Sequence, residues 1–184
     1  MAVLFLPMAV VGTVLYVKEP ELLEKRLKMK ETEQEQKKMI KFSSMFMLMG
    51  YILSGIDFRY GWSRVPLALV IISFILVALG YGLFAYVLKT NAYASRTVNI
   101  QENQELIDYG PYKIVRHPMY TASVLIYMIS PLALGSWFGF MVMLIYPFLL
   151  RIRIENEEEI LTKGLKGYKE YKEAVKWRLF PYIW

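Results

Sequence analysis

The sequence has no cysteine and a single histidine, His117. Without cysteine the chain cannot form disulfides, iron–sulfur clusters, thiolate zinc sites or a cysteine nucleophile. One histidine also excludes a site in which several histidines hold a metal, and we expect no metal.

Charge is missing from two long stretches. Residues 66–88 and 119–150 contain no Asp, Glu, Lys, Arg or His. Ion pumps and proton-coupled transporters usually keep ionisable groups at membrane depth, where these groups bind or relay the charge. The absence argues against such functions and predicts that any chemistry lies at the edge of the membrane.

Apolar residues make up 56% of the 184-residue chain, too many for an ordinary soluble domain. A membrane-spanning helix needs about 20 apolar residues. Apolar runs occupy 1–17, 39–56, 66–88 and 119–150, and the last is too long for one helix and is interrupted by Pro131 and Gly135. We predict an all-α integral membrane protein, with five transmembrane helices of which the last two form a tight hairpin. The first run has no basic start or cleavage site, so we interpret it as a retained span.

The basic residues predict an orientation. Lys and Arg number eight in 18–41, four in 89–118 and eight in 151–184, against two in 57–65. By the positive-inside rule, the N-terminus lies outside, and the 89–118 loop and the C-terminal tail are cytoplasmic. The net charge of +6 then reflects this topology and contact with anionic lipids, with no need for nucleic acid. We expect 18–41 to run along the membrane surface as a helix.

One short segment combines unusual residues just before an apolar run: YGPYKIVRHPMY, residues 109–120. Pro118 restricts His117 to an extended conformation and suits the first turn of a helix. A helix start carries unpaired N–H groups and partial positive charge, so together with Arg116 it can receive an anion. The same residues are also compatible with a structural role, in which Arg116 meets lipid phosphate and His117 caps the helix.

A second polar cluster follows the last apolar run. Arg153 and Glu157 are four residues apart, as are Arg151 and Glu155, so each pair shares a face if the helix continues. Exposed charge pairs are the usual meaning of this spacing. Aromatic residues suited to a membrane interface come next, however. We therefore predict a cytoplasmic cleft between the 89–118 loop and the start of the tail, roofed by the rest of the tail.

These motifs occur in a recognisable order. LIDYGPYKIVRHPMY, RIRIENEEE, YKEY at 168–171 and VKWRLFP at 175–181 resemble the successive motifs of the isoprenylcysteine carboxyl methyltransferases and their prokaryotic relatives. The resemblance covers about residues 97–184, which we expect to form the catalytic region of a single membrane domain spanning 1–184. Residues 1–96 would supply the N-terminal spans and the surface connector.

The resemblance implies an enzyme that binds S-adenosylmethionine, with S-adenosylhomocysteine as product. It implies that Glu157 touches the cofactor and that Arg153 helps to hold the acceptor, and these two are the predicted catalytic residues. The spacing leaves Glu158 as an alternative to Glu157. The other predicted cofactor-binding residues are Leu106, Ile107, Tyr112, Arg116, His117 and Tyr120.

Methyl transfer from a sulfonium to a carboxylate gains from positioning and from exclusion of water. A carboxylic acid with a pKa of about 3.5 is already ionised at neutral pH, so no general base is needed to deprotonate the acceptor. The expected reaction is O-methylation of an isoprenylcysteine-like carboxylate whose lipid part enters from the bilayer. Three alternatives remain: methylation of a phospholipid amine, an NADPH-dependent membrane reductase of the sterol type, and a non-catalytic scaffold.

Overall fold

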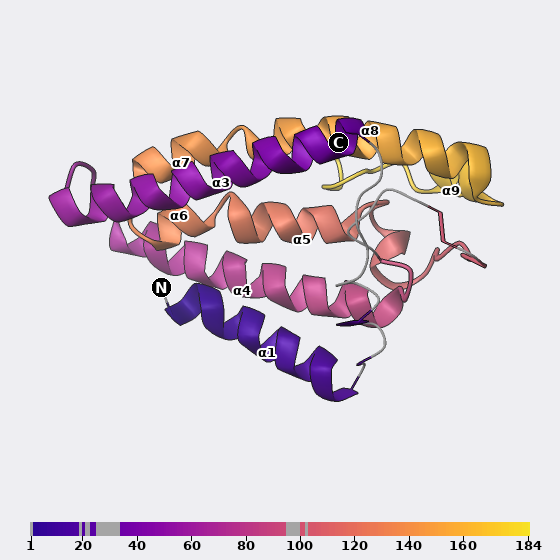
Figure 1. Cartoon of the computed structure of the whole chain (residues 1–184), viewed down its shortest axis with the longest axis horizontal. Coiled ribbons are helices and arrows are strands. Elements are labelled where there is room, and N and C mark those ends of the chain that lie inside the picture. The colour runs from indigo at the N-terminus through magenta and orange to yellow at the C-terminus, as the bar shows by residue number, and fades with distance from the viewer. Residues whose placement is uncertain (1, 19, 21–22, 25–33, 95–99, 102) are drawn as a thin grey trace.

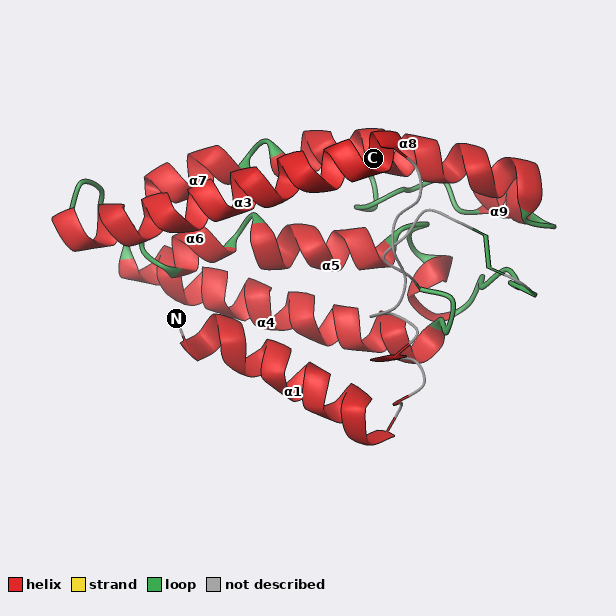
Figure 2. Ribbon diagram, viewed as in Figure 1, coloured by secondary structure: helices red, strands yellow, loops and turns green. Residues whose placement is uncertain are grey.

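The protein is helical throughout the part of the chain that is described. The computed structural model describes residues 2–18, 20, 23–24, 34–94, 100–101 and 103–184, and in these residues there is no strand (Figure 2). The elements are α1 Ala2–Lys18, α3 Gln34–Tyr60, α4 Leu67–Thr90, the 3₁₀ helix η1 Gly110–Lys113, α5 Pro118–Tyr127, α6 Ser130–Ala133, α7 Trp137–Met143, α8 Tyr146–Gly164 and α9 Tyr168–Ala174.

The long helices run side by side (Figure 1). One side of the molecule consists of α3 packed on α7 and α8. The shorter helices α5 and α6 lie in the middle and pack on α4, and α1 packs on the outer side of α4. At one end, α4 finishes, α5 begins and α8 finishes, so the loop before α5 and the segment after α8 gather there.

Three helical stretches are long and apolar enough to cross a membrane: Lys37–Tyr60, Leu67–Thr90 and Trp137–Gly164. Two further apolar stretches, Leu6–Lys18 and Pro118–Ala133, are shorter. The prediction of an all-α protein with membrane-spanning helices is thus confirmed for the described residues, whereas five crossings with a terminal hairpin stay a prediction. Much of the expected surface helix at 18–41 lies outside the described residues, and its last part, from Gln34, begins α3.

One break in the long apolar run lies where the sequence suggested, at Gly135 and Ser136. Gly135 takes a left-handed φ of +80°, a conformation that side chains disfavour. Ser136 then caps α7, because its hydroxyl accepts a hydrogen bond from the Gly139 amide at 3.0 Å. The same hydroxyl donates to buried Asp57 at 2.5 Å, and Ser63 donates to Asp57 from both its amide and its hydroxyl. Asp57 therefore ties the end of α3 to the start of α7.

Small residues allow the helices to approach closely. A Cβ added to Gly80 of α4 would lie 3.2 Å from the Ala122 carbonyl of α5, and one added to Gly139 of α7 would lie 2.9 Å from the Gly50 carbonyl of α3. The backbones could not come this close with larger side chains. These contacts hold α5 against α4 and α7 against α3, and so fix the helices from which the polar end of the molecule is built.

The segment after α9 folds back on the start of α5. The amides of Arg116 and His117 donate to the carbonyls of Trp177 and Arg178, each at 2.9 Å. The Thr121 hydroxyl donates to the Leu179 carbonyl at 2.7 Å. These bonds fasten residues 175–179 to the helix entrance and so help to fix the His117 backbone.

Candidate active site

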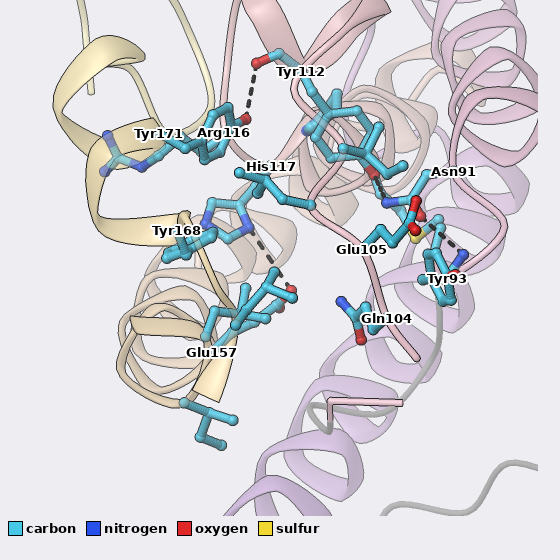
Figure 3. Close-up of a pocket in the computed structure, with 18 of the residues that line it drawn as sticks. Asn91, Tyr93, Gln104, Glu105, Tyr112, Arg116, His117, Glu157, Tyr168 and Tyr171 are labelled. Carbon is cyan, nitrogen blue, oxygen red and sulfur yellow. Dashed lines mark hydrogen bonds and ion pairs between the residues drawn. The ribbon is translucent and has the colours of Figure 1, made fainter. Parts of the chain in front are cut away.

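A cavity lies at the polar end of the molecule, between the loop before α5, the last turns of α8, and α9 (Figure 3). Counted with its open mouth, it holds about 840 Å³ of empty space. Most of the predicted cofactor-binding residues line it: Leu106, Ile107, Tyr112, Arg116, His117, Tyr120 and Glu157. We call it the first cavity. Its lining combines apolar side chains with a few polar and charged groups, a composition common in small-molecule sites.

His117 stands where α5 begins, as predicted. Its backbone, at φ −125° and ψ 61°, lies outside the helical region, and Pro118 opens the helix. The imidazole stacks on the Tyr120 ring, with centroids 5.7 Å apart, and its Nδ1 lies 4.0 Å from a Glu157 carboxylate oxygen. The histidine is 5% exposed. The imidazole therefore forms part of the wall of the first cavity and lies next to the Glu157 carboxylate, which lines the same cavity.

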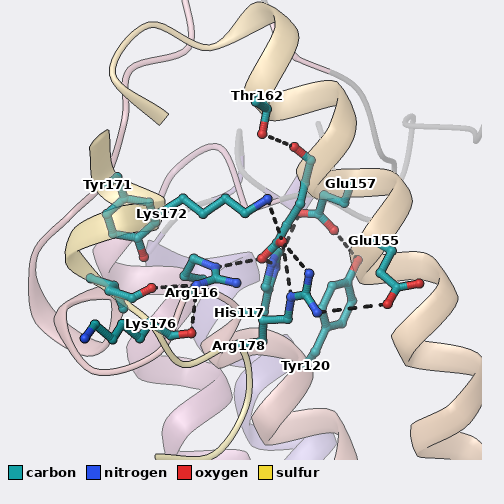
Figure 4. A network of polar contacts seen from close by, with 12 residues as sticks. Arg116, His117, Tyr120, Glu155, Glu157, Thr162, Tyr171, Lys172, Lys176 and Arg178 are labelled. Carbon is teal, nitrogen blue, oxygen red and sulfur yellow. Dashed lines mark hydrogen bonds and ion pairs between the residues drawn. The ribbon is translucent and has the colours of Figure 1, made fainter. Parts of the chain in front are cut away.

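Glu158 is turned away from the first cavity, in contrast to Glu157. It is 2% exposed, and its partners Arg116, His117, Lys172 and Arg178 are labelled in Figure 4. Its carboxylate accepts hydrogen bonds from Arg116 Nε at 2.7 Å and from Arg178 Nε at 3.1 Å, and lies 3.2 Å from His117 Nε2 and 3.5 Å from Lys172 Nζ. Burying a carboxylate requires such compensation. Glu158 thus joins α8 to the α5 entrance, α9 and the segment after it.

Arg116 belongs mainly to this network, although it also touches the first cavity. Its Nη1 donates to the carbonyls of Val175 and Lys176, at 2.6 and 2.9 Å, while its Nε donates to Glu158. These contacts hold the guanidinium against residues 175–176. Arg116 therefore helps to hold the segment after α9 against α8, whether or not it also contacts a ligand.

Arg153 faces a different space. A second cavity lies among α3, α4, α5 and α8, with about 1250 Å³ of empty space counted with its open side. Arg153 is the only charged residue among the described residues that line it; the others are Met39, Ile40, Ser43, Ser44, Met47, Phe84, Met119, Tyr120, Ser123, Tyr127, Tyr146, Leu149 and Leu150. A mostly apolar cavity with one cation suits a lipid-like molecule that carries one polar end.

Tyr120 stands between the two cavities. It and Met119 line both of them. The Tyr120 hydroxyl donates to Glu157 at 2.5 Å and accepts from Arg153 Nε at 2.9 Å. Because α8 continues as one helix through both residues, Arg153 and Glu157 share a face, as the four-residue spacing predicted. One hydroxyl therefore joins the carboxylate of one cavity to the guanidinium of the other.

Several residues that line the first cavity are not among the predicted site residues. The Asn91 amide, just after α4, donates to the Tyr112 hydroxyl at 2.8 Å, and the Tyr171 hydroxyl donates to the Tyr112 carbonyl, also at 2.8 Å. A single asparagine after an apolar run is too common to indicate a site. Tyr168 and Tyr171 belong to the YKEY motif, and both line the cavity.

No cluster of three or more potential ligands that could hold a metal ion occurs in the portion of the chain for which coordinates are described. The side chains that line the two cavities include the carboxylates of Glu105 and Glu157, the guanidinium groups of Arg116 and Arg153, the His117 imidazole and several phenols. Such groups can bind, orient and desolvate two reactants on opposite sides of Tyr120.

Comparison with known proteins agrees with this chemistry. The family model for phospholipid methyltransferases matches residues 68–167, which is 100 of the 184 residues and includes α4, α5 and α8. No curated protein matches the chain. The match supports the resemblance to integral-membrane methyltransferases in general. The narrower assignment to the isoprenylcysteine carboxyl methyltransferases stays a prediction. Since the match covers more than half of its length, the chain belongs to the phospholipid methyltransferase family.

Proposed function

We propose that the protein transfers a methyl group from S-adenosylmethionine to a lipophilic acceptor at the cytoplasmic face of a membrane. One observation carries the proposal. Two cavities share the wall formed by Met119 and Tyr120, and this wall is bonded to Glu157 on one side and Arg153 on the other. A polar donor and a lipid acceptor can then be held separately and meet at the wall.

The first cavity fits the cofactor in its chemistry. Apolar side chains such as Leu106 and Leu161 offer surface to a nucleoside, and Glu157 supplies a negative charge that favours a sulfonium. When bound, S-adenosylmethionine supplies an electrophilic methyl group. The protein's part is to orient it and to exclude water, which accounts for much of the catalysis available to such a displacement.

The second cavity fits the acceptor. Its apolar walls suit a prenyl or acyl chain entering from the bilayer, and Arg153 suits an anionic group at the chain's end. A guanidinium can hold a carboxylate through two parallel hydrogen bonds. On this basis our first choice of reaction is O-methylation of an isoprenylcysteine-like carboxylate, with Arg153 and Glu157 as the catalytic residues.

The family match favours a second acceptor, a phospholipid amine. An ammonium group must lose a proton before it can attack a methyl donor. In that reaction Arg153 would meet the phosphate of the headgroup and leave the amine to face Tyr120. The two acceptor classes therefore place the same arginine on different parts of the substrate.

The same proposal includes the topology expected from the charges. Five crossings, an outer N-terminus and a cytoplasmic 89–118 loop and tail would place the first cavity on the cytoplasmic side, where the cofactor is available. A single domain, with 97–184 as the catalytic region, is consistent with the cavities, although residues from α3, from α4 and from the segment just after α4 also line them.

Binding of S-adenosylhomocysteine tests the proposal most directly. Calorimetric titration of the detergent-solubilised protein should give saturable one-site binding, whereas NADPH should give none. S-Adenosylhomocysteine presents the nucleoside and amino acid of the cofactor, so the first cavity should accept it. Saturable NADPH binding without S-adenosylhomocysteine binding would replace methyl transfer by the reductase alternative.

The pH dependence of turnover separates the two acceptor classes. With a carboxylate acceptor, kcat/KM should be flat between about pH 6 and 8, because the acid is fully ionised well below this range. With an amine acceptor, kcat/KM should rise about tenfold per pH unit below the amine pKa. Rates measured with one prenylated carboxylate and one phospholipid amine over this range decide between them.

A further inference from the structure

Tyr168 opens α9 and follows directly on the last residue of the family match. Its side chain is 3% exposed and lines the first cavity. Among the residues whose positions are described, none offers its hydroxyl a hydrogen-bond partner. A buried hydroxyl left unpaired is unfavourable and uncommon, so its presence calls for an explanation.

The other tyrosines of the cavity wall are different. Tyr93 donates to the Asn103 carbonyl, Tyr112 accepts from Asn91, Tyr120 donates to Glu157, and Tyr171 donates to the Tyr112 carbonyl. Each of these hydroxyls is used within the protein. The Tyr168 hydroxyl therefore stands out against four neighbours of the same chemical type that line the same cavity.

The fold holds Tyr168 in place. Gly167 adopts a left-handed φ of +83°, and the Tyr168 amide donates to the Leu165 carbonyl at 3.2 Å. Its ring lies against Tyr171, with centroids 5.7 Å apart. The side chain is thus fixed from two directions within the wall of the cavity.

The hydroxyl keeps its proton at neutral pH. Burial, followed by the nearby carboxylates of Glu158 and Glu157, raises the pKa of Tyr168 above its usual value near 10. A neutral phenol offers one O–H donor. Its natural partner in the cavity is an acceptor atom of a bound molecule.

We propose that the Tyr168 hydroxyl donates a hydrogen bond to the S-adenosyl ligand in the first cavity and is one of its binding residues. This inference rests on the proposed function. It adds a contact from α9, beyond the segment covered by the family match. It also explains why an unpaired hydroxyl is kept in a buried position: the bond is completed when the ligand binds.

The test is the Tyr168→Phe variant, which removes the hydroxyl and keeps the ring. Its affinity for S-adenosylhomocysteine should fall about 3- to 10-fold in calorimetric titration, the usual effect of one neutral hydrogen bond. Without ligand, its melting temperature should stay the same or rise, because no internal bond is lost. The rise in melting temperature on adding S-adenosylhomocysteine should be smaller than in the wild type.

Tyr171→Phe is the matched control. Its hydroxyl is bonded to the Tyr112 carbonyl, so this variant should melt at a lower temperature without ligand. The inference is overturned if Tyr168→Phe binds S-adenosylhomocysteine as tightly as the wild type. It is overturned equally if Tyr168→Phe loses as much thermal stability as Tyr171→Phe, which would reveal an internal partner. A wild type that binds no S-adenosylhomocysteine would instead remove the proposed function itself.

Discussion

Glu157→Ala and Arg153→Ala should each reduce methyl transfer by about 10²–10³-fold while the protein stays folded. The two side chains face different cavities and meet at one atom, the Tyr120 hydroxyl. Removal of Glu157 takes away the charge that faces a sulfonium. Removal of Arg153 takes away the cation that lines the second cavity. Glu157 is 26% exposed and loses one hydrogen bond, from the Tyr120 hydroxyl, so the cost in stability should be about 1–3 kcal/mol and should leave the protein folded.

The two variants should differ in how they fail. Glu157→Ala should weaken binding of S-adenosylhomocysteine, whereas Arg153→Ala should leave that affinity nearly unchanged and act on the acceptor. Arg153→Lys keeps the charge but cannot form two parallel hydrogen bonds, so it should also be impaired. Glu159→Ala is the control, because Glu159 lies on the exposed side of the same helix and pairs with Lys163. Wild-type rates in both alanine variants would remove the proposed site.

Replacing the neighbouring residue, in Glu158→Ala, should instead destabilise the protein by about 3–5 kcal/mol. The carboxylate is 2% exposed and compensates Arg116, Arg178 and Lys172 at once. Without the carboxylate, the positive charges of these side chains repel one another with less negative charge to offset them. In addition, α8 loses its hydrogen bonds to the α5 entrance and to the segment after α9. For a chain of this size the melting temperature should fall on the order of 10 °C.

Thermal unfolding in detergent, followed by circular dichroism, measures this effect. Glu159→Ala again serves as the control and should shift the melting temperature by no more than about 2 °C, because exposed pairs contribute little. Glu158→Gln keeps the acceptor oxygen without the charge and should fall between the two. If Glu158→Ala melted like the control while Glu157→Ala unfolded, the roles that we assign to the two residues would be reversed.

The helices could be predicted from the sequence mainly where apolar residues dominate. The run at 66–88 corresponds closely to α4, Leu67–Thr90. The run at 39–56 is extended in the structure to Gln34–Tyr60, because polar helix formers such as Gln and Lys continue a helix beyond its apolar part. The run at 119–150 becomes several helical pieces, with breaks at Met128–Ile129, at Gly135 and at Leu144–Ile145. Pro131 and Gly135 signalled the interruption, but not the number of pieces.

The candidate site could be predicted as a set of motifs but not as a set of contacts. The order of the motifs led to His117, Tyr120, Arg153 and Glu157. The difference between Glu157 and Glu158 depends on a rotation of about 100° around the axis of α8, which only packing can settle. The separation into two cavities with Tyr120 between them likewise depends on how α3, α5 and α8 pack. That the Tyr168 hydroxyl has no hydrogen-bond partner among the described residues can be recognised only from the positions of all neighbouring donors and acceptors.

The bonds between the α5 entrance and residues 175–179 also bear on the order of assembly during synthesis. Arg116 and Thr121 take partners that are made about 60 residues later. The ribosome releases the chain from its N-terminus onwards, so the hydrophobic helices can enter the bilayer while these partners are still inside the exit tunnel. The helices can therefore be in place before the first cavity is complete, and a nascent chain halted before residue 175 would lack the bonds that fix the α5 entrance.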